Sequence, residues 1–211
     1  MRRLSFVLLV LSAASSADAQ IIRQRYSLGA PTAWFSLGAG AQQGFSVTDG
    51  TTKTTWDFGN GTQYIATLEK AFSGGTTVGL RGTHSKVPLR YGTSALATDA
   101  DANVSQFMGT VHVAGSTGFH SVLELSAGAT MYSNFRAQSD GRQLTPTSPD
   151  LDFAFAFGYG FGYSFSSKFS IDIVQDLTTS IHQKTGLNAG DDSTVRLHGT
   201  RVMGRFGLGG R

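Results

Sequence analysis

The segment from Leu151 to Phe165 alternates strictly between large apolar side chains and small or polar ones. Successive side chains of a strand point to opposite faces, so one face of this segment is apolar and mainly aromatic. The other face carries mainly alanine and glycine, whereas a sheet face in water normally carries polar and charged side chains. The segment exceeds the usual globular strand of about five or six residues, but it suits a tilted membrane-spanning strand of about nine to eleven residues with overhanging ends. The alternation predicts a lipid-facing row made of Phe153, Phe155, Phe157, Tyr159, Phe161, Tyr163 and Phe165.

The N-terminus has the layout of a secretory signal peptide. Arg2 and Arg3 precede an apolar run at residues 4–11, and residues 17–19 read Ala-Asp-Ala, which is an A-x-A cleavage site. The apolar run is too short to cross a bilayer as a helix. We therefore expect a signal peptide at residues 1–19, followed by a single outer-membrane β-barrel domain at residues 20–211.

The composition favours an exported membrane barrel over a periplasmic enzyme. Charged residues make up 15% of the chain, below the roughly 25% of ordinary soluble domains, and 27 of the 211 residues are glycine. The chain has no cysteine, so no disulfide holds it together. The formal net charge of +3 is too small to indicate a nucleic-acid partner, and none is expected.

Eight segments of the chain show the period-two alternation of strands. They lie at residues 33–41, 62–72, 76–84, 103–114, 121–135, 151–165, 169–181 and 194–208. The long connections at 46–61, 91–102, 136–150 and 183–193 alternate with short turns. This rhythm predicts an all-β fold, an eight-stranded antiparallel up-and-down transmembrane β-barrel. The alternation slips by one residue between His84 and Val87, just before Pro88, so we expect a bulge or a strand end there.

The alternation, the rhythm of the connections and the N-terminal segment together resemble the small eight-stranded bacterial outer-membrane barrels, the group that includes outer-membrane proteins A, X and W. The resemblance spans residues 31–208 and is architectural, with no diagnostic catalytic motif. It implies a place in the bacterial outer membrane, contact with outer-membrane lipid and lipopolysaccharide, insertion by the barrel-insertion machinery, and a monomer. Members of the group usually end on an aromatic residue, whereas here five residues follow the last aromatic, Phe206.

If the apolar rows face lipid, the opposite rows fill the lumen. An eight-stranded interior is just wide enough for side chains to fill it, and an unpaired buried charge is very costly. We therefore predict a plugged core of paired charges; a gated ion path or a small-ligand pocket is the alternative. The predicted lumen charge network consists of Glu69, Arg81, His112, Glu124, Asp172, Asp176, Arg201 and Arg205.

The sequence favours a structural or interaction role, with the long loops carrying any specificity and no enzymatic activity. One alternative is a lipid A-modifying enzyme. A barrel deacylase of lipid A uses an outward His-x-Ser pair with a supporting carboxylate, and His198 and Thr200 have the matching spacing on the last strand. Threonine replaces the serine, however, and the outward positions Ile173, Gln175 and Leu177 of the preceding strand offer no carboxylate.

Two further alternatives are a narrow channel for small solutes and a soluble lipocalin-like barrel with its apolar rows inside. Neither a cofactor nor a metal is expected. His84, His120 and His182 are isolated at strand ends or turns, and no pair of them has the spacing of metal ligands on one strand.

Overall fold

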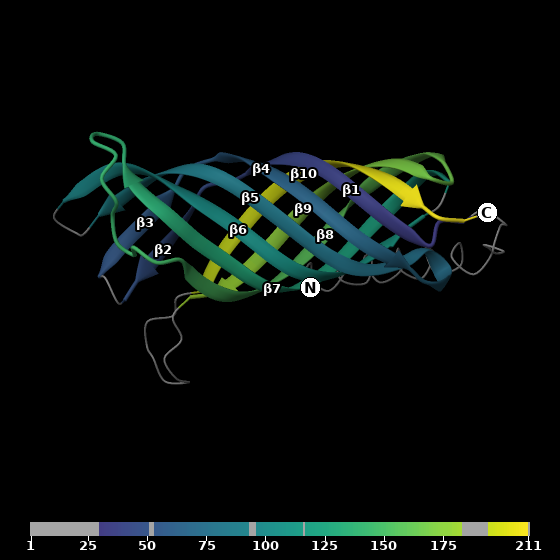
Figure 1. The fold of residues 1–211 in the computed structure, drawn as a ribbon, viewed down its shortest axis with the longest axis horizontal. Coiled ribbons are helices and arrows are strands. Elements are labelled where there is room, and N and C mark those ends of the chain that lie inside the picture. Colours follow the sequence, from purple (N-terminus) through teal and green to yellow (C-terminus); the bar gives the residue numbers. More distant parts are fainter. Residues whose placement is uncertain (1–29, 51–52, 93–95, 116, 183–193, 211) are drawn as a thin grey trace, which may run out of the picture.

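The computed structural model describes residues 30–50, 53–92, 96–115, 117–182 and 194–210. Antiparallel strands wrap into an elongated barrel, seen from the side in Figure 1. No helix in these ranges is long and apolar enough to cross a membrane. The expected signal peptide at 1–19 and the expected loop at 183–193 lie outside the described residues.

Eight strands of the described chain close the barrel, and a shorter hairpin extends it at one end. The hairpin consists of β2 (Phe45–Asp49) and β3 (Thr54–Phe58). The barrel strands are β1 (Ala33–Gln42), β4 (Gly61–Ala71), β5 (Thr76–Gly92), β6 (Ala97–Ala114), β7 (Gly118–Ala137), β8 (Asp150–Ser166), β9 (Phe169–Ile181) and β10 (Thr194–Leu208). A single 3₁₀ turn, η1 (Ser73–Gly75), joins β4 to β5.

Every barrel strand pairs antiparallel with its two neighbours. β1 pairs with both β4 and β10, and the β5–β6 pairing completes the ring. We call the end with η1 and the C-terminal end of β10 the turn end, and the opposite end, with the β2–β3 hairpin, the loop end (Figure 1). Closure pairs each of the eight barrel strands on both sides, which is the condition for a sheet to lie in lipid, whereas among the described strands β2 of the hairpin pairs only with β3.

The structure confirms the predicted fold class, an eight-stranded antiparallel barrel, and reproduces the predicted bounds 169–181 and 194–208. Two predicted loops are wrong. Residues 46–61 contain most of the β2–β3 hairpin, and β6 already begins at Ala97, inside the segment predicted as a loop at 91–102. Both segments are rich in polar residues, which favoured a loop. In the structure, however, β2 and β3 alternate strictly between buried and exposed side chains, and the start of β6 alternates between more and less buried ones.

The expected bulge or strand end near Pro88 is also wrong. β5 pairs with β6 without a register shift from Thr76 to Gly92, and Pro88 lies opposite Asp101 on the exposed face. The apolar row changes face because the surroundings of the strand change. Val78 and Leu80 are exposed on the outside near the turn end, whereas Val87 and Leu89 are buried inside near the loop end.

The largest hydrophobic core lies inside the barrel at the loop end, where the hairpin and the extended parts of β5, β6 and β7 enclose it. We call this core the aromatic cluster. Its buried members are Phe45, Val47, Trp56, Phe58, Val87, Leu89, Ala100, Ala102, Val104, Tyr132, Phe135, Val195 and Leu197. Here the strands follow the soluble pattern, apolar inside and polar outside, which is the reverse of the pattern nearer the turn end.

Candidate functional site: a lumen filled at two levels

The lumen contains charged side chains toward the turn end and the aromatic cluster at the loop end. All eight side chains of the predicted lumen network point into the barrel, and each is buried. They come from six strands, β4, β5, β6, β7, β9 and β10, so their contacts span the interior. The structure brings them together as two groups of ion pairs, one around Glu124 and one around Arg205.

Glu124 lies at the centre of this network. Its carboxylate accepts a hydrogen bond from Arg81 and another from Arg201, the latter at 2.9 Å from Nη2 to Oε1. Arg201 Nε also lies 2.8 Å from Asp176 Oδ2, and His112 Nδ1 lies 3.3 Å from Glu124 Oε2. Arg81 Nη1 lies 3.3 Å from Asp176 Oδ1 as well, so each of these two buried arginines contacts two carboxylates, which offsets the cost of removing the guanidinium groups from water.

A second group of contacts lies nearer the turn end. Arg205 Nη2 donates to Glu69 Oε2 at 2.6 Å, and its Nη1 lies 3.7 Å from Asp172 Oδ2. Asp172 Oδ1 lies 3.3 Å from His120 Nε2. The expectation that His120 is isolated is therefore wrong. His120 and Glu124 lie on the same face of β7, because both are at even positions. Beginning the strand predicted at 121–135 one residue earlier would have placed His120 in the lumen.

The glycines of β8 leave space for these charges. A Cβ at Gly158 would lie 3.1 Å from Asp176 Oδ1 and 3.2 Å from Glu124 Cβ. A Cβ at Gly162 would overlap the Asp172 carboxylate and the His120 imidazole. The small face of β8 is therefore the lumen face, because long side chains from neighbouring strands occupy the volume that its own side chains would need.

The aromatic cluster closes the other end of the lumen. The ring centroids of Trp56 and Phe135 lie 4.7 Å apart, and those of Phe45 and Phe58 lie 4.5 Å apart. The expectation of a polar loop at 46–61 leaves no place for this cluster, which the β2–β3 hairpin forms in the structure. The period-two spacing of Phe45 and Val47, and of Trp56 and Phe58, was the signal that could have found it.

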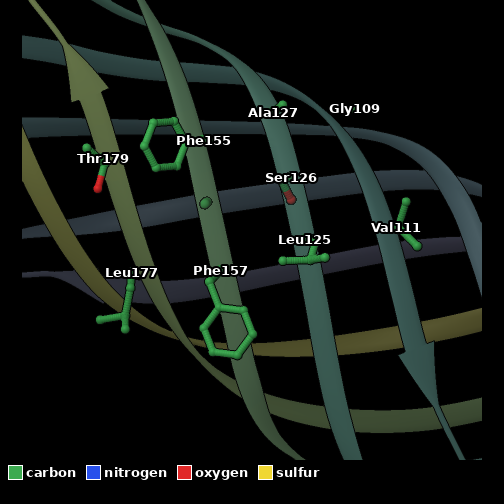
Figure 2. A pocket seen from close by; sticks show the side chains of 10 residues that line it. Gly109, Val111, Leu125, Ser126, Ala127, Phe155, Phe157, Leu177 and Thr179 are labelled. Carbon is green, nitrogen blue, oxygen red and sulfur yellow. The ribbon is translucent and has the colours of Figure 1, made fainter.

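The seven aromatic side chains predicted to face lipid all point outward from β8. Their exposed fractions lie between 42% for Phe157 and 60% for Phe165. Leu125 and Leu177 lie on either side of Phe157 on the neighbouring strands. These side chains line an open apolar hollow of about 540 Å³ on the outer surface of β6 to β9. Figure 2 shows them from close by.

The candidate residues for acyl-chain hydrolysis also lie on the outer surface, without the arrangement of a catalytic triad. His198 and Thr200 are both exposed on β10. The Thr200 hydroxyl donates to Gln175 Oε1 at 2.5 Å, and within the described ranges no carboxylate pairs with His198. The hydroxyl is thus engaged by an amide, which cannot act as its general base.

A third group of polar side chains lies at the loop end, beyond the outward aromatic row. His182 Nδ1 lies 3.0 Å from Asp152 Oδ2 and 3.8 Å from Asp150 Oδ2. The expectation that His182 is isolated is therefore wrong, because its carboxylate neighbours belong to the adjacent strand β8 and not to its own. Burial alone would lower the pKa of His182, but the hydrogen bond that its imidazole donates to Asp152 and the charges of Asp152, Asp150 and Asp49 raise it. The pKa of Asp150 is also raised, mainly by burial, although the positive charge of His182 acts in the opposite direction.

Comparisons with known proteins find the fold but no family. No protein-family model matches the chain, and no curated protein sequence matches it. Among solved structures, the barrel is similar to Neisserial surface protein A (NspA), with a TM-score of 0.54 and 9% sequence identity over 82% of this chain and 97% of that one.

Two other similar structures are Ail, the attachment invasion locus protein of Yersinia pestis, and OprG, an outer-membrane protein of Pseudomonas aeruginosa. Their TM-scores are 0.44 and 0.45, with identities of 17% and 10%. They cover 82% and 85% of this chain, and 98% of each of their own chains. At these identities the similarity extends to the fold alone. The chain is an eight-stranded barrel of the outer-membrane kind.

Proposed function

We propose that this protein is an integral protein of the bacterial outer membrane with a structural or interaction role and a closed lumen. The observation that carries this proposal is the filling of the lumen at two levels, by the charge network and by the aromatic cluster. A barrel filled in this way offers no continuous water path, so its contacts with other molecules take place on its outer surface and at the loop end.

The outer surface supports the membrane part of this proposal. The exposed large apolar side chains form a band around β1 and β4 to β10, as an outer-membrane barrel requires. A continuous apolar band of this extent is not stable in water, which argues against a soluble lipocalin-like barrel. Outer-membrane lipid and lipopolysaccharide are then its surroundings, the barrel-insertion machinery its assembly partner, and the monomer its working form.

The loop end supports the interaction part. There the outward side chains are polar and partly fixed by one another. Lys86 Nζ lies 3.0 Å from Asp101 Oδ2, and Gln138 Nε2 donates to Asp101 Oδ1 at 2.9 Å. The extended β5, β6 and β7 thus present a rigid polar surface beyond the apolar band, and this surface is where any specificity of the protein lies.

The purified protein is expected to produce no steady conductance steps in planar lipid bilayers at neutral pH. The reason is that buried arginine–carboxylate pairs and packed aromatic rings occupy the cross-section of the barrel. An open porin in the same bilayers is the positive control, and heat-modifiable migration on a gel shows that the inserted protein is folded. Regular single-channel steps from folded protein would contradict the closed lumen and favour the narrow-channel alternative.

A further inference from the structure

The group of Asp150, Asp152 and His182 at the loop end has the composition and spacing of a metal site. One ligand atom from each side chain lies within 4.8 Å of the other two. Metal–ligand bonds of about 2.0–2.2 Å place neighbouring ligand atoms of a tetrahedral site roughly 3.3–3.6 Å apart. The separations from His182 Nδ1, 3.0 Å to Asp152 and 3.8 Å to Asp150, lie on either side of that range.

The charge of this group also calls for a cation. No arginine or lysine in the described ranges forms an ion pair with Asp150 or Asp152, and His182 is the side chain that faces both carboxylates. A second combination of possible ligand residues consists of Glu69, His112 and Glu124, but its carboxylates are paired with arginines. Arg205 pairs with Glu69, and both Arg81 and Arg201 pair with Glu124, so that combination already has its cations.

Two aromatic side chains, Trp56 and Tyr132, hold His182 in place at this group. The His182 ring lies 5.4 Å from the Trp56 ring and 6.0 Å from the Tyr132 ring, so the imidazole is fixed within the aromatic cluster. The Tyr132 side chain is fully buried opposite Asp150, and its hydroxyl lies close to the Ser180 side chain and to the Asp152 carboxylate. That hydroxyl can donate to a coordinated carboxylate or to a water molecule on the metal, which is the usual second layer of a metal site.

We propose that Asp150, Asp152 and His182 bind a divalent transition-metal ion of the zinc type at the loop end of the barrel. One imidazole nitrogen with carboxylate oxygens suits zinc and its first-row neighbours, whereas calcium and magnesium require shells made of oxygen alone. The Asp150 side chain keeps 24% of its surface exposed, which gives a hydrated ion access from outside. The bound ion connects the ends of β8 and β9 under the β2–β3 hairpin.

Isothermal titration of the folded, tag-free protein in detergent micelles with zinc chloride tests this proposal. We expect one ion per chain, with Asp150→Asn weakening the affinity at least tenfold and His182→Ala abolishing saturable binding. His120→Ala is the matched control, because His120 also pairs with a buried aspartate but belongs to the turn-end group, and it is expected to bind zinc as the wild type does. Millimolar calcium or magnesium is expected not to displace the zinc.

Tryptophan fluorescence gives an independent readout. The sequence has two tryptophans. In a Trp34→Phe host only Trp56 remains, next to His182. Cobalt(II), which quenches nearby indoles, is expected to quench this emission saturably, and excess zinc is expected to restore it. Three results would each overturn the proposal: the folded wild type does not bind zinc saturably, His182→Ala binds zinc as the wild type does, or calcium displaces the zinc.

Discussion

Replacing Glu124 with glutamine is expected to lower the free energy of unfolding by about 3–5 kcal/mol, the usual cost of breaking a buried ion pair from one side. Glu124 contacts both Arg81 and Arg201, and its carboxylate and both guanidinium groups are almost fully buried. With glutamine at this position, Asp176 is left as the carboxylate partner of both arginines. Urea titration of the protein in lipid vesicles, followed by tryptophan fluorescence, measures the change.

Asp140→Asn is the matched control for that experiment. Asp140 also faces an arginine, but its carboxylate lies 4.0 Å from Arg142 and both side chains are more than half exposed. Exposed pairs of this kind contribute about 0–1 kcal/mol, so the control is expected to unfold almost as the wild type does. A Glu124→Gln variant as stable as this control would show that water, and not side-chain pairing, solvates the charges in the lumen.

Replacing Phe157 with arginine is expected to destabilise the membrane-inserted barrel by about 2–4 kcal/mol, the cost of a cationic side chain near the bilayer midplane. Phe157 lies in the middle part of the outward row of β8, between Leu125 and Leu177 on the adjacent strands. A charged head at this depth is far from both interfaces and can reach water only by distorting the bilayer. The unfolding midpoint in vesicles, compared with that of the wild type, measures the effect.

Thr48→Arg provides the control for Phe157→Arg. Thr48 is also exposed on the outside of the barrel, but it belongs to the β2–β3 hairpin, beyond the apolar band. Arginine there stays in water, and surface substitutions of this kind usually change stability by within about 0.5 kcal/mol. Equal effects of the two substitutions would mean that the β8 row and the hairpin have the same surroundings, contrary to the account.

The two levels of the lumen explain how one chain can satisfy two environments. Near the turn end the outside is apolar and the inside holds paired charges around Glu124 and Arg201. Near the loop end the outside is polar and the inside is packed around Trp56. Since both arrangements use the same period of two, β5 passes from one to the other without a bulge, with only the identity of the buried residues changing.

The apolar side chains face outward near the turn end and inward near the loop end, and this change limits what can be predicted from the sequence. Period-two alternation located β9 and β10 at their observed bounds and placed the charged rows inside, because a barrel in lipid must turn its apolar rows outward. The same alternation does not say which face is inside once the strands leave the lipid. For that reason residues 46–61, which include Trp56, were predicted as a loop although they form most of the β2–β3 hairpin.

The group around His182 was missed for a different reason. Its members are distant in sequence, with Asp152 thirty residues before His182 and on another strand. The β8–β9 register, which places Phe153 opposite Ile181, brings them together. A search for ligands spaced along one strand cannot detect such a site; the pairing register must be known first.

The most direct test of the central claim is a cysteine scan of β8. The sequence contains no cysteine, so single substitutions from Phe153→Cys to Phe165→Cys can be spin-labelled without changing any other position. In lipid vesicles we expect labels at the odd positions to collide often with dissolved oxygen and rarely with a water-soluble nickel chelate, whereas a label at Thr48→Cys on the exposed hairpin shows the reverse. Odd positions that the nickel chelate reaches freely, or that are shielded from both reagents, would contradict the claim that this aromatic row faces hydrocarbon.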